Sequence, residues 1–225
     1  MKQVLVIGAS RGIGLELVRQ YRQAGDAVTA TARGDEGMAR LQALGARTLW
    51  LDLATDAAAT ALTGPLDGAA FDVVLLCAGV YGPRSGGLQA PTQGEFDTVM
   101  HTNVLGAMRV LPQLVDALAP GAPLPRVAVI SSRMGSMGLR ASPSGWLYRA
   151  SKAALNSVLV DASLVLAGKA ICVALHPGWV RTDMGGAGAD IDVQTSAADL
   201  RRTLAALQPA DTGGFFNHDG QPLSW

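Results

Sequence analysis

Short apolar runs alternate with longer amphipathic stretches along the 225 residues of the chain. The runs are nearly continuous rather than alternating, which is typical of strands covered on both faces of a parallel sheet. Because glycine, proline or polar residues bound each run, we expect about seven strands. These are residues 4–7, 27–32, 47–51, 71–76, 126–130, 170–175 and a short one at 215–216.

The stretches between the runs have helical periodicity. The first ends near Ala24, before Gly25, and five others cover residues 36–44, 55–62, 96–118, 148–167 and 195–207. Strands that alternate with helices of this length predict an α/β fold, namely a Rossmann-type doubly wound parallel sheet with helices on both faces. No linker or repeat divides the chain, so we expect a single domain over residues 1–225.

Composition narrows the possible partners. Hydrophobic residues make up 49% of the chain and charged residues 16%, which argues against disorder. Basic and acidic residues both total 18 and form no run of like charge, so neither a nucleic-acid nor a membrane partner is expected. The longest apolar run, residues 73–80, is too short to span a bilayer, and we expect a cytoplasmic protein.

The cysteines and histidines do not suggest a metal centre. Cys77 and Cys172 lie in apolar runs and are expected to be free thiols. His101, His176 and His218 occur singly, without ligand spacing, so no metal is expected.

A glycine-rich turn joins the first strand to the first helix. It reads Gly8-Ala9-Ser10-Arg11-Gly12-Ile13-Gly14. Small residues let a phosphate approach the backbone, while free N–H groups and the helix dipole attract the anion. We therefore expect Gly8, Ser10, Arg11, Gly12, Ile13 and Gly14 to contact a dinucleotide. The alternative is a glycine turn selected only for packing.

The second strand ends at Arg33, where an acidic residue would favour NAD(H) by binding the ribose 2′-hydroxyl. A cation suits a 2′-phosphate instead, and Arg11 is expected nearby. The two arginines predict NADP(H), with NAD(H) the less favoured cofactor; the alternative is that either one only faces solvent. Asp52 follows the third strand and could accept a hydrogen bond from an adenine amino group.

Lys152 follows Tyr148 by four positions in the sequence, so the two side chains would share one helix face. A free tyrosine has a pKa of about 10, and an ammonium about 4 Å away contributes roughly 4 kcal/mol at an effective dielectric near 20. Lys152 could therefore lower the pKa of Tyr148 by up to about two or three units, and by less where solvent screens the charge, which makes Tyr148 a candidate proton-transfer group. The alternative is a solvated helix pair. Asn103 is either a kink-forming side chain that faces a cavity or a surface residue.

Taken together and in order, these motifs resemble the short-chain dehydrogenase/reductase family, in particular the small carbonyl-reductase branch related to C-factor and sniffer proteins. The resemblance runs from Gly8 to Gly220. It implies a catalytic set of Asn103, Ser132, Tyr148 and Lys152, with Ser132 preferred to Ser131. It also implies that the cofactor contacts, besides the glycine turn, are Arg33, Asp52, Leu53, Ala78, Gly79, Tyr148, Lys152, Pro177, Gly178, Val180 and Thr182.

Three positions depart from the family pattern. Ile7 replaces a threonine before the first glycine, and Cys77 replaces the asparagine of an Asn-Ala-Gly motif. The segment between Ser132 and Tyr148 is longer than is common, with residues 142–145 as the expected insertion. Ile7 and Cys77 are supporting positions, so local stability is more in question there than chemistry. The insertion is expected to border the substrate pocket.

The resemblance implies reduction of a small aldehyde or ketone, with a homodimer or homotetramer expected. A short segment after Met184 predicts an exposed pocket with loose selectivity. Its expected walls are Tyr81, Met134, Trp146, Trp179 and Met184. One alternative is an NADP(H)-binding sensor without turnover. Another is a sugar-nucleotide epimerase, for which the chain lacks a long C-terminal substrate domain.

Overall fold

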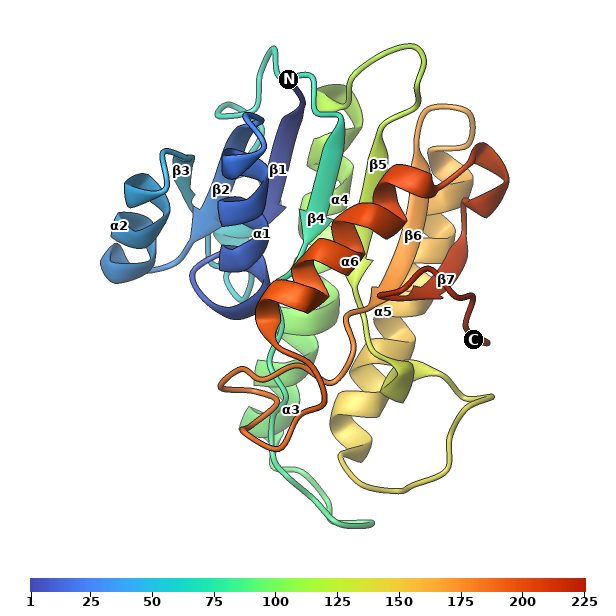
Figure 1. Ribbon diagram of the computed structural model, residues 1–225. Coiled ribbons are helices and arrows are strands. Elements are labelled where there is room, and N and C mark those ends of the chain that lie inside the picture. Colours follow the sequence, from blue (N-terminus) through green and yellow to red (C-terminus); the bar gives the residue numbers. More distant parts are fainter.

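The computed structural model describes residues 1–225 and contains one sheet of seven parallel strands. The strand order is β3-β2-β1-β4-β5-β6-β7 (Figure 1). The predicted α/β fold with a doubly wound parallel sheet is therefore confirmed. The strands are β1 (Gln3–Ile7), β2 (Ala27–Ala32), β3 (Arg47–Trp50), β4 (Val73–Leu76), β5 (Arg126–Ile130), β6 (Ile171–His176) and β7 (Gly214–Asn217).

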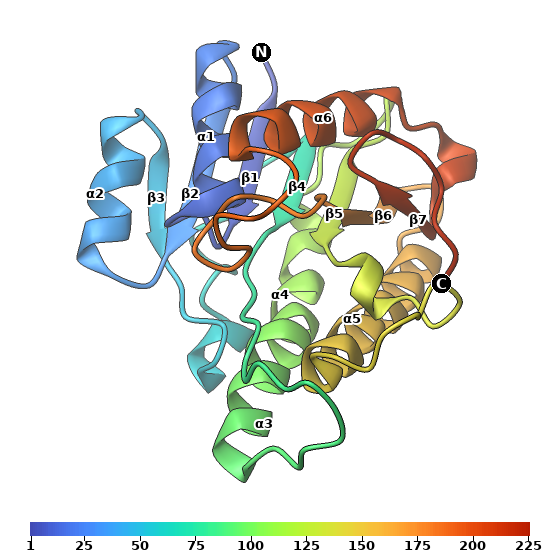
Figure 2. The ribbon, with the colours of Figure 1, turned by 60° about the horizontal axis from the view of Figure 1, so that its bottom comes forward.

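Helices cover both faces of the sheet (Figures 1 and 2). One face carries α1 (Gly12–Gln23), α2 (Asp35–Ala43) and α6 (Val193–Ala206). The other carries α4 (Gly106–Leu114) and α5 (Trp146–Val165), with α3 (Gln93–Met100) leading into α4. None of the helices combines the length and the hydropathy that crossing a bilayer requires.

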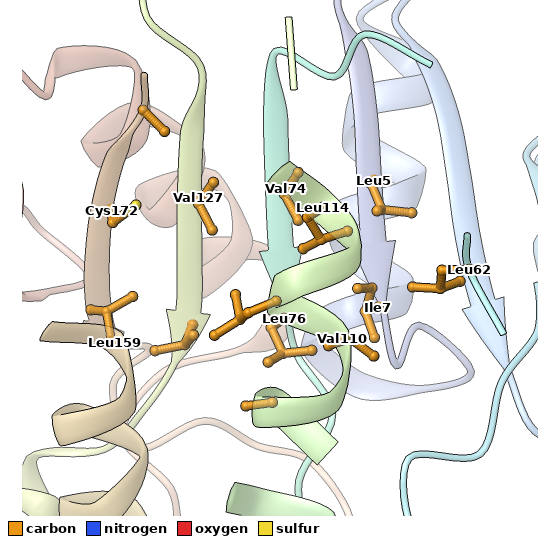
Figure 3. Packing of buried hydrophobic residues seen from close by; sticks show 14 of the residues in the cluster. Leu5, Ile7, Leu62, Val74, Leu76, Val110, Leu114, Val127, Leu159 and Cys172 are labelled. Carbon is orange, nitrogen blue, oxygen red and sulfur yellow. The ribbon is translucent and has the colours of Figure 1, made fainter. Parts of the chain in front are cut away.

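The alternation of side chains along each buried strand builds two separate cores. In β1, Leu5 and Ile7 point to the α4–α5 face, where they join Val110 and Leu159 (Figure 3). Val4 and Val6 point to the opposite face and pack with residues of α1 and α6. The continuous apolar run in the sequence thus reflects a strand that is buried on both sides.

The predicted helix at 55–62 is wrong. Only a single 3₁₀ turn forms, at Asp56–Ala59, and further turns follow it. The side chain of Gln113 explains the difference, because its oxygen accepts the N–H of Leu62 at 2.8 Å and its amide donates to the carbonyl oxygen of Ala58 at 2.7 Å. These contacts replace bonds that a regular helix would make within itself.

The predicted helix at 96–118 is interrupted rather than continuous. A π-helical turn at His101–Leu105 separates α3 from α4, and a 3₁₀ turn at Val115–Ala117 ends the segment. Pro112, inside α4, has no N–H to donate to the helix ladder. The π-helical turn carries Asn103, whose contacts are described below.

Candidate active site

A cleft of about 420 Å³ opens at the carboxyl edge of the sheet. It lies where the chain reverses its direction across the sheet, since β2 flanks β1 on one side and β4 flanks it on the other. Ligands of doubly wound sheets bind at such a switch point. Figure 2 looks toward this edge and shows the glycine turn, the segment after β6 and the start of α5 around it.

Most of the predicted cofactor-binding residues line this cleft. Gly178 and Val180 are the two that do not. Asn103 and Ser132 also lie outside the lining, whereas their chain neighbours Thr102 and Ser131 belong to it. Lining residues that the sequence did not single out include Thr31, Arg40, Cys77, Val80, Ile130, Arg181 and Asp183.

The glycine turn allows close backbone packing and also leaves N–H groups free to bind an anion. Gly8 has φ +82°, and a Cβ there would lie 2.5 Å from the Cβ of Ala78; a Cβ on Gly14 would lie 2.6 Å from the carbonyl oxygen of Gly8. Packing therefore requires these two glycines. Helix α1 begins at Gly12 without a side-chain cap, so the N–H groups of its first turn remain available to an anion.

Arg11, Arg33 and Arg40 line the cleft. Arg33 is 3.8 Å from Oδ1 of Asp52, and Arg11 forms a 3.1 Å ion pair with Asp183 across the cleft. Arg40 of α2 donates from Nε to the carbonyl oxygen of Ser10 at 3.1 Å. Both Arg11 and Arg33 are largely exposed, yet both line the cleft, so they face solvent and the site together. This donor set fits a phosphate-bearing dinucleotide.

Arg40 was missed because it lies in the middle of a charged helix, where a solvated arginine is the ordinary interpretation. The signal in the sequence is Gly37, three residues earlier. A Cβ on Gly37 would lie 2.7 Å from the Cβ of Ser10, so α2 packs closely on the glycine turn. That close approach brings Arg40 to the cleft.

Tyr148 and Lys152 occupy one face of α5, as their spacing predicts. The ammonium of Lys152 lies 5.7 Å from the centroid of the Tyr148 ring and donates to the carbonyl oxygen of Ile130 at 2.8 Å. Both side chains are buried. The solvated-pair alternative therefore does not apply.

The predicted lowering of the Tyr148 pKa is wrong for this structure. Burial raises the pKa of Tyr148 to about 12, although a hydrogen bond with Ser132 lowers it and the neighbouring Tyr81 raises it further. Burial also lowers the pKa of Lys152 to about 8, against an opposing effect of Cys77. Desolvation disfavours the charged form of both groups, and the spacing of the two residues in the sequence does not reveal it.

The two serines at the end of β5 make different contacts. The hydroxyl of Ser131 donates to Oδ1 of the buried Asn156. Ser132 accepts the N–H of Met134 at 3.1 Å, and its side chain acts to lower the pKa of Tyr148. Ser132 is thus the serine whose side chain influences the tyrosine.

Asn103 is buried, so the surface alternative is wrong. Its Oδ1 accepts the N–H of Val80 at 2.8 Å, and its Nδ2 donates to the carbonyl oxygen of Val80 and to Oγ of Ser151, both at 2.9 Å. A Cβ on Gly79 would lie 3.3 Å from both Oδ1 of Asn103 and Nζ of Lys152. Asn103 therefore ties the segment after β4 to α5 beside Lys152.

Gly178 and Val180 contact Ile191 rather than the cleft. Val180 is buried and forms an isolated bridge with Ile191, and a Cβ on Gly178 would lie 2.6 Å from Cδ1 of the same residue. Pro177 and Thr182, on either side, do line the cleft. The cofactor contacts of Gly178 and Val180 stay predictions.

The predicted substrate walls divide into two groups. Tyr81 stacks on Tyr148 with ring centroids 4.6 Å apart, and a Cβ on Gly145 would meet both Tyr81 and Met134. Met184 lines the cleft. Trp146 and Trp179 instead donate to backbone oxygens of Gln89 and Gly185 and are partly exposed.

Comparison with known proteins agrees with this architecture. The family model described as short chain dehydrogenase matches residues 2–190. C-signal of Myxococcus xanthus is 40% identical over 124 residues, which is 55% of this chain and 74% of that protein.

Solved carbonyl reductases share the fold. Carbonyl reductase Sniffer of D. melanogaster is 30% identical with a TM-score of 0.86, and all of both chains is covered. The NADPH-bound carbonyl reductase from chicken fatty liver is also 30% identical with a TM-score of 0.86, covering 100% of this chain and 94% of that one. The chain belongs to the short-chain dehydrogenase family and resembles its carbonyl reductase branch.

Proposed function

We propose that this protein is an NADP(H)-dependent reductase that transfers hydride to the carbonyl carbon of a small aldehyde or ketone. The observation that carries the proposal is one continuous cleft that is lined both by Arg11, Arg33 and Arg40 and by the Tyr148–Lys152 pair. The similarity to solved carbonyl reductases, one of them bound to NADPH, supports the same proposed activity.

The cofactor's 2′-phosphate would lie among Arg11, Arg33 and Arg40, and its pyrophosphate would lie against the uncapped start of α1. Asp52 and Leu53 would flank the adenine. Lys152 would bind the nicotinamide ribose. When bound, the reduced nicotinamide supplies hydride, and the protein supplies position and charge.

Tyr148 acts as the proton donor in this proposal. A pKa of about 12 keeps the phenol protonated near neutral pH, which is the form that reduction of a carbonyl needs. The alkoxide that develops on the substrate is a stronger base than phenolate, so it can take this proton. Ser132, whose side chain acts to lower the pKa of Tyr148, would donate to the same oxygen as its charge grows.

Lys152 and Asn103 hold the reacting groups in place. Lys152 is fixed by the carbonyl oxygen of Ile130, and Asn103 fixes the segment that carries Gly79 and Val80. Asn103 could also hold a water that returns a proton toward Lys152. We infer a positioning role for Asn103, because its recorded hydrogen bonds go to Val80 and Ser151.

A thermal-shift comparison of NADPH with NADH tests the cofactor, and loss of NADPH absorbance over a panel of carbonyl compounds tests the reaction. We expect stabilisation by NADPH at lower concentration than by NADH. Tyr148→Phe should abolish turnover and retain NADPH binding. Tyr21→Phe is the matched control, because Tyr21 is equally buried but packs in α1 away from the cleft.

Two outcomes would contradict the proposal. Appreciable turnover by Tyr148→Phe would remove the assigned proton donor. Stabilisation of the native protein by NADPH, without turnover of any carbonyl compound, would favour a sensor that binds the cofactor.

The homodimer or homotetramer expected from the resemblance stays a prediction. Met108 of α4 and Leu164 and Val165 of α5 are exposed apolar side chains that such an association could cover. Sedimentation at several protein concentrations would test it.

A further inference from the structure

We infer that Arg84 recognises an anionic group, such as a carboxylate, on the carbonyl substrate. The inference rests on the proposed function, because it names the substrate class of the same site. The first observation is a stack of three side chains. The ring of Tyr81 lies on the ring of Tyr148 at 4.6 Å, and the guanidinium of Arg84 lies 5.1 Å from the centroid of Tyr81.

This stack sets an upper limit on the distance between Arg84 and the proposed reaction centre. Its guanidinium can be no farther from the Tyr148 ring than the sum of the two stacking distances. A benzene ring that carries an aldehyde and a carboxylate at opposite positions has a similar length. A substrate whose carbonyl reaches Tyr148 can therefore place a second polar group near Arg84.

The second observation is that Arg84 has no acidic partner. It forms none of the ion pairs in the protein, and its single hydrogen bond runs from Nη2 to the carbonyl oxygen of Met184 at 2.8 Å. A guanidinium has five N–H donors in a planar fork that matches a carboxylate, so most of them remain available.

The third observation concerns the other charges of this region. Arg133 and Arg140, on the loop between Ser132 and Tyr148, are exposed and also form no ion pair. The nearest acidic residue in sequence to Met184 is Asp183, which pairs with Arg11. Two negative groups lie beside these loops, Glu95 next to Gly82 and Pro83 and the C-terminal carboxylate of Trp225 next to Ser136 and Gly138. Neither forms an ion pair with Arg84, Arg133 or Arg140.

The side chains around the Tyr81 stack are mostly apolar. Tyr81 presents its ring, Met134 approaches the position of a Gly145 Cβ within 3.2 Å, and Met184 lines the cleft. A flat or aromatic body with a carbonyl at one end and a carboxylate at the other combines the features that these side chains favour.

Arg84 also joins two loops, because it links the segment after β4 to the segment after β6 through Met184. Its removal could therefore weaken any substrate by loosening the site. A comparison of two substrates with the same body separates the two effects. We suggest 4-formylbenzoate and its methyl ester, which differ in the carboxylate charge at one end.

For the wild-type protein with NADPH, we expect kcat/KM for the acid to exceed that for the ester by about tenfold, as one exposed charge-assisted hydrogen bond would give. Arg84→Gln should remove this preference through a higher KM for the acid, while the ester changes little. Arg84→Lys should keep part of it. Arg47→Gln is the matched control, because Arg47 is also exposed and donates one 2.8 Å bond to a backbone oxygen, that of Pro65.

An equal loss for acid and ester in Arg84→Gln would overturn the inference and leave Arg84 as a link between loops. A wild-type preference for the ester would overturn it as well, while leaving the proposed reductase activity intact. Absence of turnover for every carbonyl compound would instead overturn the proposed function, and this inference with it.

Discussion

Lys152 directs its ammonium to the backbone of β5, where it donates a 2.8 Å hydrogen bond to the carbonyl oxygen of Ile130. The same ammonium lies 5.7 Å from the centroid of the Tyr148 ring. The lysine is thus held beside the tyrosine by a third residue. Because one carbonyl dipole only partly replaces water, burial lowers the pKa of Lys152 to about 8.

This burial predicts a pH dependence of stability. Lys152 keeps its proton up to about pH 10.5 in the unfolded chain but loses it near pH 8 in the folded protein. Between these values the unfolded state binds more protons, so the contribution of Lys152 to the free energy of unfolding rises with pH, by up to about 1.4 kcal/mol per pH unit. Below pH 8 both states are protonated, and the burial cost is fully present.

Urea denaturation of the wild type and of Lys152→Met at several pH values between 7 and 10 measures this contribution. Cys77 and Tyr148 act in the opposite sense, since their raised pKa values lower stability at high pH, but both remain in the variant. We expect the stability difference, wild type minus variant, to increase with pH from about 8 upward. A constant difference would show that Lys152 stays charged in the folded protein.

We expect the loss of the Arg40 side chain to weaken the binding of NADPH but not that of NADH. Removing its charge in Arg40→Gln should raise the Kd for NADPH by about tenfold, as expected for one charge-assisted contact with a 2′-phosphate, and leave the Kd for NADH nearly unchanged. Isothermal titration of each cofactor gives both values. Arg202→Gln is the control, because Arg202 and Arg40 make the same kind of helix ion pair at 2.6 Å and Arg202 lies outside the cleft. Equal losses for both cofactors would contradict a 2′-phosphate contact.

The parts of the fold that could be predicted from sequence are those fixed by local pattern. β1 and β4 to β6 are buried on both faces, so their apolar runs mark them directly. The segment after Thr55 has good helix formers, yet Gln113, more than fifty residues away in the chain, takes the hydrogen bonds that would continue a helix. Such a contact has no local signal.

In the candidate site, too, local pattern predicted some features, whereas others depend on contacts between distant parts of the chain. The spacing of Tyr148 and Lys152 predicted their common helix face, and the strand end predicted that Ser131 and Ser132 lie at the sheet edge. The choice of Ser132 came from the family resemblance. Their ionisation could not be predicted, because it depends on burial by elements from several parts of the chain. The stack of Arg84, Tyr81 and Tyr148 likewise depends on how the loop after β4 folds back over α5.

Asn103 should contribute strongly to stability. Its truncation in Asn103→Ala leaves the half-buried N–H and carbonyl of Val80 without their side-chain partner, which should cost about 2–4 kcal/mol in the free energy of unfolding. Asn217→Ala provides a control, since the side chain of Asn217 donates only to the exposed Asp219, and it should cost less than about 0.5 kcal/mol. Denaturant titrations measure both. A cost below about 1 kcal/mol for Asn103→Ala would mean that water replaces its hydrogen bonds.

Alanine at Gly145 would meet both backbone strain and crowding by neighbouring atoms. Gly168, where only the backbone strain applies, serves as the comparison. It precedes α5 with φ +66°, and a Cβ there would lie 2.5 Å from the Tyr81 hydroxyl oxygen; Gly168 has φ +73° with nothing within 4 Å of its Cβ position. Both alanine variants should lose about 1–2 kcal/mol from left-handed strain, measured as the free energy of unfolding.

Only Gly145→Ala should also displace Tyr81 from its stack on Tyr148. We therefore expect Gly145→Ala to be the less stable variant and to raise the KM for aromatic aldehydes several-fold, whereas Gly168→Ala keeps the wild-type KM. Because the two positions have similar backbone strain, the difference between the variants reports the contacts with Tyr81 and Met134. Identical stability and identical KM in the two variants would show that Tyr81 moves aside freely, and that its stack does not shape the substrate site.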